Sequence, residues 1–361
     1  MFRNAYAGRR VLVTGHTGFK GSWLALWLQE LGAETCGLAL PMARPNHFEL
    51  LKLDMRSEML DVRDGKAVKR LVSEFRPEIV FHLAAQPLVR KSYREPAETF
   101  AVNVMGTINV LEACRSTDSV RAVVAITSDK CYENREQPTG YRETDPMGGY
   151  DPYSASKGCA ELAIAGYRRS FFHPADYGVK HRTLVASARA GNVIGGGDWA
   201  EDRLIPDLAR AAAAGKEEPL RNPAATRPWQ HVLEPLSGYL ALGEKLLSGE
   251  TAFADGWNFG PAADGMISVL EAAEAMAKAW DKVRFRAAPD PNAPHEAGLL
   301  RLDCTKAKEV LHWHGALSPE EAITATDDWY REFYEKSRVI TREQLADYIR
   351  KAADGGLEWT K

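Results

Sequence analysis

The sequence has no long run of apolar residues, no excess of basic charge and no apolar leader. No run approaches the roughly 20 apolar residues that a helix needs to cross a bilayer, so we expect no membrane partner. Lys and Arg number 46 against 49 Asp and Glu, a formal net charge of -3. This balance provides no general basic field for nucleic acid. The first ten residues lack an apolar core, so we expect no signal peptide.

Cysteine and clustered metal ligands are also scarce. The five cysteines, at 36, 114, 131, 159 and 304, are odd in number and include no Cys-x-x-Cys pair. This excludes a complete disulfide framework and suits a reducing cytoplasm. His312 and His314 flank Trp313, but no third ligand follows at a suitable spacing. We therefore expect no metal site and interpret Trp313 as a core residue.

Short apolar runs alternate with periodic, helix-like stretches over residues 10–190. This alternation predicts an α/β fold with a Rossmann-type, doubly wound parallel sheet and helices on both faces. The expected strands are Arg10–Thr14, Glu34–Leu38, Met59–Leu60, Ile79–His82, Arg121–Thr127 and Arg182–Ala188. The expected helices between them include Trp23–Leu31, Gly65–Phe75, Thr99–Cys114 and Ser154–Arg169.

From Gly195 onward the chain is rich in Gly, Pro, Arg and Trp, which indicates a smaller substrate lobe. We predict a nucleotide-binding domain of residues 1–190 plus about 230–262, interleaved with a lobe of residues 191–229 and 263–361. Thr341-Arg342-Glu343-Gln344 has the pattern of a helix capping box. The other elements expected here are helices Leu204–Ala214, Val232–Leu247, Val269–Ala279, Thr305–Leu311 and Pro319–Lys336, and a strand at Trp257–Gly260.

A glycine-rich turn joins the first expected strand to the first helix. Gly15, Gly18 and Gly21 follow the apolar run Val11–Val13 at the spacing Gly-x-x-Gly-x-x-Gly. Gly15 permits a tight turn, Gly18 lets the backbone approach a pyrophosphate, and Gly21 allows helix and strand to pack closely. The pyrophosphate would lie at the helix N-terminus. The pattern therefore predicts a dinucleotide site.

Tyr153 and Lys157 lie four residues apart, on one face of an expected helix. The lysine and the positive end of the helix would favour the phenolate of Tyr153, which makes this tyrosine a candidate general base. The spacing is common by chance, but a third element supports it. Thr127-Ser128-Asp129-Lys130 ends an apolar run, so Ser128 should lie where ligands bind in open α/β sheets.

Together these three elements resemble the extended short-chain dehydrogenase/reductase family. Further segments match along about residues 9–335: Leu60–Asp64, Ile79–Gln86, Asn103–Thr107 and Arg189–Gly195. The resemblance implies NAD as cofactor and a homodimer paired through the helices around Thr99–Cys114 and Ser154–Arg169. The cofactor residues it implies are Gly15, His16, Thr17, Gly18, Phe19, Lys20, Gly21, Asp61, Val62, Leu83, Ala84, Ala85, Gln86, Tyr153 and Lys157.

Asp129 and Lys130 point to the reaction. Nucleotide-sugar 4,6-dehydratases of this family commonly carry Asp-Glu at these positions, as an acid for the departing C6 hydroxyl and a base for the C5 proton. The run Thr127–Asn134 resembles the members that use CDP-glucose, in which lysine replaces the glutamate. The resemblance thus implies the catalytic set Ser128, Asp129, Lys130, Tyr153 and Lys157. Which of Asp129 and Lys130 is acid and which is base stays open.

Candidate substrate residues follow from the same resemblance. Guanidinium groups suit phosphate oxygens, so Arg189, Arg203 and Arg227 are candidates for the substrate diphosphate. Glu296 is a candidate for the ribose hydroxyls. The full expected substrate set is Gln86, Asn192, Arg203, Arg227, His231 and Glu296.

One departure concerns the cofactor. Family members usually end the second strand with an acidic residue that binds the adenosine ribose, whereas this chain has Ala39 and Leu40 there. No arginine replaces it, because Arg44 is several residues away, so we favour NAD over NADP. The alternatives are a dehydratase for another nucleotide sugar, a 4-epimerase of the same fold, or a non-catalytic NAD-sensing module.

Overall fold

The fold is organised around a seven-stranded sheet. The computed structural model describes residues 1–261, 265–288 and 299–361, and the strand order is β11-β6-β5-β4-β1-β2-β3. All neighbouring strands are parallel, which confirms the predicted fold class. The strands are β1 (Arg10–Thr14), β2 (Glu34–Ala39), β3 (Arg56–Met59), β4 (Ile79–His82), β5 (Ala122–Ile126), β6 (Leu184–Arg189) and β11 (Gly256–Asn258).

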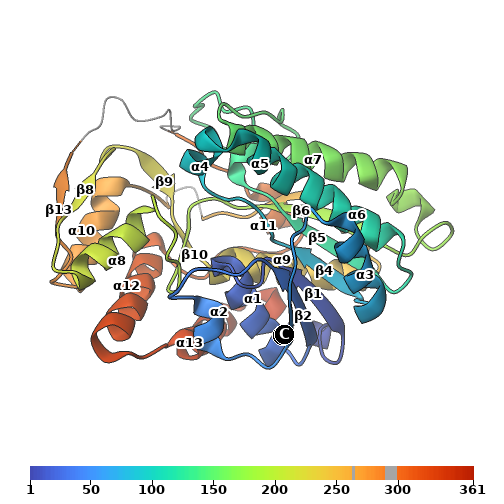
Figure 1. The fold of residues 1–361 in the computed structure, drawn as a ribbon, viewed down its shortest axis with the longest axis horizontal. Helices are drawn as coiled ribbons and strands as arrows, with labels where there is room; N and C mark the ends of the chain where they lie inside the picture. The colour runs from blue at the N-terminus through green and yellow to red at the C-terminus, as the bar shows by residue number, and fades with distance from the viewer. Residues whose placement is uncertain (262–264, 289–298) are drawn as a thin grey trace.

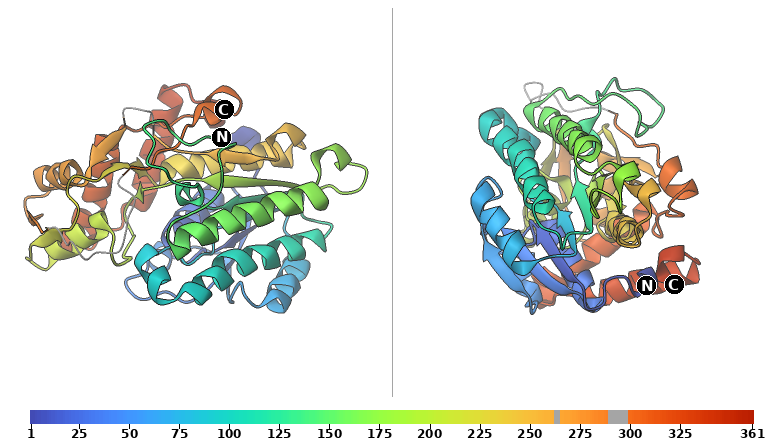
Figure 2. Two further views of the ribbon diagram at one scale, coloured as in Figure 1. Left: turned by 90° about the horizontal axis from the view of Figure 1, so that it is seen from above. Right: turned by 90° about the vertical axis from the view of Figure 1, so that its right-hand side faces the viewer.

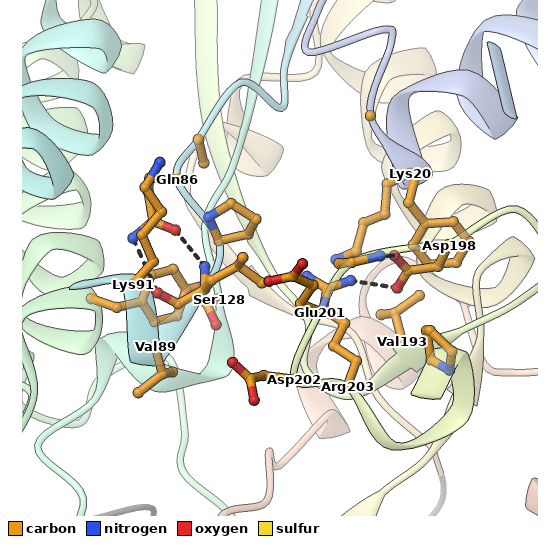
Figure 3. A pocket seen from close by; sticks show the side chains of 18 of the residues that line it. Lys20, Gln86, Val89, Lys91, Ser128, Val193, Asp198, Glu201, Asp202 and Arg203 are labelled. Carbon is orange, nitrogen blue, oxygen red and sulfur yellow. Dashed lines mark hydrogen bonds and ion pairs between the residues drawn. The ribbon is translucent and has the colours of Figure 1, made fainter. Parts of the chain in front are cut away.

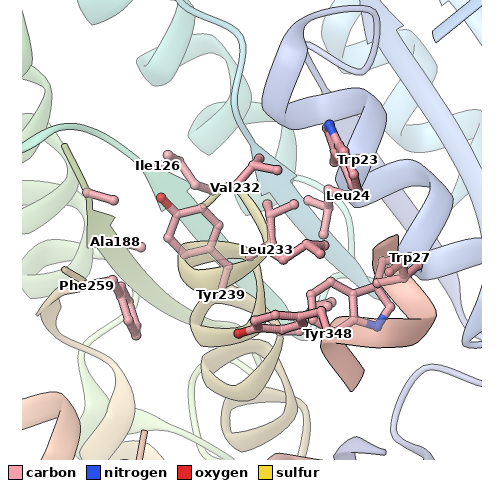
Figure 4. Close-up of a cluster of buried hydrophobic side chains, with 14 of the residues drawn as sticks. Trp23, Leu24, Trp27, Ile126, Ala188, Val232, Leu233, Tyr239, Phe259 and Tyr348 are labelled. Carbon is pink, nitrogen blue, oxygen red and sulfur yellow. The ribbon is translucent and has the colours of Figure 1, made fainter. Parts of the chain in front are cut away.

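Helices cover both faces of this sheet (Figure 1). Successive strand residues point to opposite faces, so Val11 and Val13 belong to one buried cluster and Leu12 to another. The first cluster includes Trp23 and Trp27 of α1 and the apolar side of α9 (Figure 4). The second packs against three other helices. The bounds are α1 (Phe19–Glu30), α9 (Leu233–Leu247), α3 (Gly65–Phe75), α6 (Gly106–Arg115) and α7 (Pro152–Ser170).

A smaller lobe lies at one end of the sheet (Figures 1 and 2). It contains the two-stranded sheets β12-β9 and β13-β8, and α12 packs there against α8 and α10. The pair β10-β7 lies where the chain leaves the main sheet. The bounds are β7 (Val193–Ile194), α8 (Leu204–Ala213), β8 (Glu218–Leu220), β9 (Thr226–Pro228), β10 (Gln230–His231), β12 (Met266–Ser268), α10 (Val269–Ala279), β13 (Phe285–Ala287) and α12 (Pro319–Lys336).

Several predicted boundaries shift. The stretch Thr99–Cys114 consists of α5 (Pro96–Phe100), a π-helical turn (Ala101–Met105) and α6. Of the strand expected at Met59–Leu60, only Met59 lies in β3, and the strand expected at Trp257–Gly260 is β11, which ends at Asn258. Within the described residues, no helix combines the length and apolarity needed to cross a membrane. The other α-helices of the described residues are α2 (His47–Leu51), α4 (Val89–Arg94), α11 (Thr305–Glu309) and α13 (Thr341–Asp354).

The predicted capping box at Thr341 is wrong. Helix α13 begins where expected, but its N-cap is Ile340, without a side-chain capping bond. Thr341 is fully buried, and its hydroxyl pairs with His47 Nε2 (2.8 Å) and accepts from Trp329 Nε1 (2.9 Å). These buried partners use the hydroxyl that a capping box would need.

Candidate active site

A pocket of about 1830 Å³ runs along the C-terminal ends of β1, β2, β4 and β5 and continues into the smaller lobe. This is the edge at which open α/β sheets bind ligands. All five expected catalytic residues line it, as do the expected cofactor residues other than His16. These lining residues are Ser128, Asp129, Lys130, Tyr153 and Lys157, with Gly15, Thr17, Gly18, Phe19, Lys20, Gly21, Asp61, Val62, Leu83, Ala84, Ala85 and Gln86.

The glycine-rich turn leaves no room for side chains at two positions. Gly15 has φ +77, and a Cβ there would lie 2.8 Å from the backbone nitrogen of Ala84. A Cβ on Gly21 would lie 2.1 Å from the carbonyl oxygen of Gly15. Helix α1 begins directly after Gly18, so its positive end faces the pocket. The turn therefore fits the pyrophosphate of a dinucleotide.

His16 does not line the pocket with the rest of the turn. Its ring is buried against Gly37, where a Cβ would lie 2.2 Å from His16 Cγ. Its Nε2 is hydrogen-bonded to Ser57 Oγ at 2.7 Å. Burial lowers the pKa of His16 to about 4, so the ring is neutral at physiological pH. The structure thus places His16 under the turn, where it supports β2 and β3.

Tyr153 and Lys157 lie in the first two turns of α7, which Asp151 caps by accepting from Ser154 N (2.9 Å). Burial raises the pKa of Tyr153 to about 12, although hydrogen bonding with the Ser128 side chain acts in the opposite direction. Burial lowers the pKa of Lys157 to about 8. The expected preference for phenolate is therefore not met by these side chains, because desolvation penalises the charged phenolate more than its neighbours stabilise it.

Ser128 and Asp129 form the end of the pocket nearest β5. The Ser128 hydroxyl donates to Asp129 Oδ1 (2.9 Å) and accepts from the backbone nitrogen of Lys130 (3.2 Å). Asp129 is 2% exposed, and its Oδ2 has no hydrogen-bond partner among the described residues. Gly191 packs directly against that carboxylate, since a Cβ there would lie 1.9 Å from Asp129 Oδ2. A buried carboxylate oxygen is thus left for a further partner.

The lobe side of the pocket is charged. Figure 3 shows Lys20 and Asp198 on the side opposite Gln86 and Ser128. Arg203 donates to Asp198 Oδ2 at 2.6 Å. Burial lowers the pKa of Lys20 to about 7, and the charge of Arg203 adds to the shift. Sequence reasoning missed Asp198, although the glycines at 195–197 just before it indicate a close approach of the backbone.

The other expected substrate residues are divided between the pocket and the core. Gln86, Asn192, Arg203 and Arg227 line the pocket, with Asn192 in the left-handed region at φ 49. His231 is 1% exposed and does not line it; its ring packs edge-on against Trp23, 5.7 Å between centroids. Glu296 lies outside the described residues.

Arg189 is not in the pocket, which corrects its assignment as a diphosphate candidate. Its guanidinium is buried and pairs with Glu161 Oε2 at 2.7 Å, and it also donates to the hydroxyl of Tyr132. Burial alone would raise the pKa of Glu161, but the charge and hydrogen bond of Arg189 hold that pKa below its usual value. Glu161 lies one helical turn after Lys157, so this ion pair fixes α7 to β6 beneath the pocket.

The expectation of no metal site came from the spacing of His312 and His314 in the sequence. In the part of the chain that the structure describes, no group of three His, Cys, Asp or Glu residues is arranged to hold a metal ion. His314 Nδ1 is instead hydrogen-bonded to the carbonyl of Gly315 (3.0 Å). Trp313 is 2% exposed and donates to Ser237 Oγ (2.8 Å), which confirms its prediction as a core residue.

Comparisons with known proteins agree with this geometry. The sequence profile of the GDP-mannose 4,6 dehydratase family matches residues 12–326. The chain is 48% identical over 352 residues to CDP-glucose 4,6-dehydratase of Salmonella typhimurium, covering 96% of this chain and 98% of that protein. It is 27% identical to dTDP-glucose 4,6-dehydratase of Xanthomonas campestris pv. campestris, covering 88% and 92%.

Solved structures show the same fold. UDP-glucose 4-epimerase of Thermus thermophilus, in complex with NAD, has a TM-score of 0.76 at 28% identity, covering 89% of this chain and 99% of that one. dTDP-glucose 4,6-dehydratase of Streptomyces venezuelae, with NAD bound, has a TM-score of 0.74 at 22% identity, covering 90% and 97%. The second likeness concerns the fold alone.

Proposed function

Because the chain belongs to the GDP-mannose 4,6-dehydratase family of extended short-chain dehydrogenases/reductases, we propose that it removes water from CDP-glucose. The product would be CDP-4-keto-6-deoxy-glucose, with no net change of redox state. The choice of nucleotide and sugar rests on the relative at 48% identity. The observation that supports the reaction type is that Ser128, Asp129, Lys130 and Tyr153 all line the same pocket.

NAD is the proposed cofactor. The fit rests on the two glycines that admit no Cβ and on the helix N-terminus beside them. Gly15, Gly18, Asp61 and Val62 would hold its adenosine and pyrophosphate, and Lys157 its nicotinamide ribose. When bound, NAD supplies a hydride acceptor that also returns the hydride within one turnover.

Tyr153 is the proposed base for the C4 hydroxyl. Its buried side chain lies in the pocket wall, and Ser128 at the end of β5 would hold the same substrate hydroxyl. With a pKa raised to about 12, the phenol is protonated in neutral solution. Tyr153 would therefore accept the substrate proton only as positive charge nearby offsets the desolvation of the phenolate.

Asp129 and Lys130 are proposed to serve the elimination that follows. A 4-keto group acidifies the C5 proton, which Lys130, or water positioned by it, would remove. The unpartnered Oδ2 of Asp129 suits a role in protonating the C6 hydroxyl as it leaves as water. Gly191 permits this arrangement, because any side chain there would displace the carboxylate.

A 4-epimerase of the same fold is the nearest alternative, and a non-catalytic NAD-sensing module is an alternative of another class. An epimerase needs no charged pair after Ser128, and a sensing module needs neither that pair nor Tyr153. The buried, oriented Asp129 therefore favours the dehydratase.

We also propose two features of the whole protein. The first is a division into an NAD-binding part, residues 1–190 with about 230–262, and an interleaved nucleotide-sugar lobe. The second is a homodimer paired through α6 and α7. Support for pairing comes from exposed apolar side chains on this side, with Met105 50% exposed and Leu162 62% exposed.

The test is a substrate panel. The purified protein is incubated with CDP-, dTDP-, UDP- and GDP-hexoses, and the 4-keto-6-deoxy product is measured. We expect the keto sugar from CDP-glucose. A 4-epimer without keto product would favour the epimerase, and no conversion of any sugar would contradict both enzymes.

A further inference from the structure

Three buried side chains around the C-terminal end of β6 each carry a polar atom that has no hydrogen-bond partner among the described residues. These atoms are Asp129 Oδ2, the hydroxyl oxygen of Tyr239 and Gln230 Oε1. The three residues are 2%, 0% and 3% exposed respectively. Buried polar groups are nearly always paired, either within the protein or with an ordered water molecule. Three unpaired atoms on neighbouring side chains therefore point to a shared partner.

The amide of Gln230, in β10, connects the surroundings of the other two side chains. Its Nε2 donates to the backbone carbonyls of Gly191 (3.0 Å) and Phe259 (3.1 Å), so the orientation of the amide is determined and Oε1 is an acceptor. Gly191 is also the residue that packs directly against Asp129 Oδ2. The ring of Phe259 packs edge-on against that of Tyr239, with 5.6 Å between centroids. All three unpaired atoms thus belong to residues that share the neighbours Gly191 and Phe259.

Tyr239 approaches Asp129 from the side of α9, which packs on β5 and β6. Figure 4 shows its hydroxyl directed towards Ile126, the last residue of β5 and three residues before Asp129. Burial raises the pKa of Tyr239, and the charge of Asp129 adds to the shift, so the hydroxyl stays protonated and is a hydrogen-bond donor. Neither Tyr239 nor Gln230 lines the pocket, so a ligand in the pocket is not their partner.

The donors and acceptors of this group match one water molecule. An ionised carboxylate and an amide oxygen only accept, so Asp129 Oδ2 and Gln230 Oε1 cannot pair with each other. Water carries two donors and accepts as well, and a buried water typically makes about three hydrogen bonds. A water molecule that accepts from the Tyr239 hydroxyl and donates to the two acceptors would satisfy all three atoms.

We propose that an internal water molecule binds at Asp129 Oδ2, Tyr239 and Gln230, and that Tyr239 and Gln230 are positioning residues for the Asp129 carboxylate. Ser128 donates to Oδ1 of the same carboxylate, so both oxygens are held, one by a hydroxyl and one by the water. A carboxylate held at both oxygens keeps its orientation during the reaction. The inference rests on the proposed function only in taking Asp129 to act in the elimination.

The sign of a stability change tests the water site. Tyr239→Phe keeps the ring and removes the hydroxyl. Removing a hydroxyl that binds nothing should raise the unfolding temperature, because an unpaired buried polar group is lost. Removing one that binds the water should lower it by roughly 1–3 °C. The decrease should be smaller in an Asp129→Asn background, because the two side chains share the water.

Tyr6→Phe is the matched control for this cycle. Tyr6 is also buried, and its hydroxyl donates to the backbone carbonyl of Leu240 in the same helix, but it does not line the pocket. Its substitution should lower the unfolding temperature equally in both backgrounds. An increase in unfolding temperature for Tyr239→Phe, or a decrease that is the same with and without Asp129→Asn, would overturn the proposal.

Turnover tests the positioning role separately. Tyr239→Phe should lower kcat roughly ten- to a hundredfold, as expected when a reacting group is misplaced, with little change in KM because Tyr239 does not line the pocket. Reduced nicotinamide should accumulate during turnover, since only the elimination is slowed, whereas Tyr6→Phe should show neither effect. An unchanged kcat for Tyr239→Phe would overturn the positioning role. If the unmodified protein converts no nucleotide sugar, the proposed function fails, while the unfolding measurements still test the water site.

Discussion

At the residue scale, burial controls which groups in this protein are charged. It raises the pKa of Tyr153 to about 12 and lowers those of Lys157 and Lys20 to about 8 and about 7. All three changes favour neutral side chains in the pocket.

Tyr153→Phe tests the proposed base. Turnover should fall roughly a hundred- to ten-thousandfold, the usual contribution of a positioned acid or base, while NAD binding measured by fluorescence titration changes little. Tyr150→Phe is the control, because Tyr150 lines the same pocket but is 80% exposed. Near-normal activity of Tyr153→Phe would exclude it as the base.

Lys130→Met and Asp129→Asn test the division of labour. If these side chains serve only elimination, the first hydride transfer survives and reduced cofactor accumulates, because only the later step loses stabilisation. The absorbance of reduced nicotinamide should rise after CDP-glucose is added, with little keto-deoxy product. Normal turnover in both variants would contradict this division, and a failure of both to reduce the cofactor would place the pair in substrate positioning.

Asp327 provides a pH-dependent test of stability. Both carboxylate oxygens are buried without a hydrogen-bond partner among the described residues, and burial raises the pKa from 3.8 to about 7. The neutral Asp327 side chain is favoured in the folded protein over the unfolded one, so its contribution to stability is complete below pH 3.8. That contribution is lost as the pH rises through about 7, where the buried carboxyl must ionise. Asp327→Asn should stabilise the fold at pH 8 by on the order of 1–3 kcal/mol. Thermal unfolding should show little effect at pH 4, and equal shifts at both pH values would contradict the assignment.

At the element scale, the site depends on how closely strand ends and helices approach. The backbone after β6 packs against the side chain of Asp129, which follows β5, and this contact is possible only with glycine at position 191. Helix α7 is held on β6 by the buried pair Glu161–Arg189. These contacts place Tyr153 and Asp129 together without a direct hydrogen bond between them.

Two glycine-to-alanine substitutions distinguish the effect of packing at the site on turnover from the effect of helix propensity on stability. Gly191→Ala should displace the Asp129 carboxylate and reduce turnover by roughly a hundredfold, as expected for a shift of about 1 Å in a catalytic group. Gly166→Ala in α7 meets no atom within 4 Å, so it should leave turnover unchanged and add roughly 0.5–1 kcal/mol of stability. Full activity of Gly191→Ala would contradict the packing argument.

Sequence patterns predict elements best where local signals are strong. The bounds of β1, β4, α3, α10 and α12 agree with prediction because buried runs and helical periods end abruptly at Gly, Pro or polar residues. The location of Arg189 could not be predicted, since its partner Glu161 is 28 residues away in the chain. The capping box predicted at Thr341 was wrong for the same reason, because the distant residues His47 and Trp329 bind its hydroxyl and override the local capping pattern. The pocket positions of Asp129 and Tyr153 were predictable from their motifs, whereas the ion pairs of Asp202 with Arg90 and Arg221 leave no local signal in the sequence.

At the scale of the whole molecule, one side of the sheet carries exposed apolar groups on adjacent helices. Met105 lies in the π-helical turn before α6, Leu162 lies on α7, and the two helices pack together. A second copy of the chain would cover this apolar surface in a two-fold arrangement.

Leu162→Glu should therefore shift the proposed dimer towards monomer at micromolar concentration, because a charge would be buried at the interface. Sedimentation velocity measures the change. Val179→Glu is the control, since Val179 is 86% exposed in a loop outside these helices. A monomeric unmodified protein, or dimers in both variants, would contradict pairing through α7.

The interleaved chain path also determines the order in which the molecule can assemble during synthesis. Six strands of the main sheet have emerged once β6 is complete, but α9, which packs on β5 and β6, ends only at Leu247, and β11 ends at Asn258. Until then, part of one apolar sheet face and the edge at β6 remain uncovered while the first segment of the lobe is made. Such surfaces are prone to aggregation, so we expect the nascent chain to be most prone to aggregation at this stage, before α9 and β11 cover the sheet.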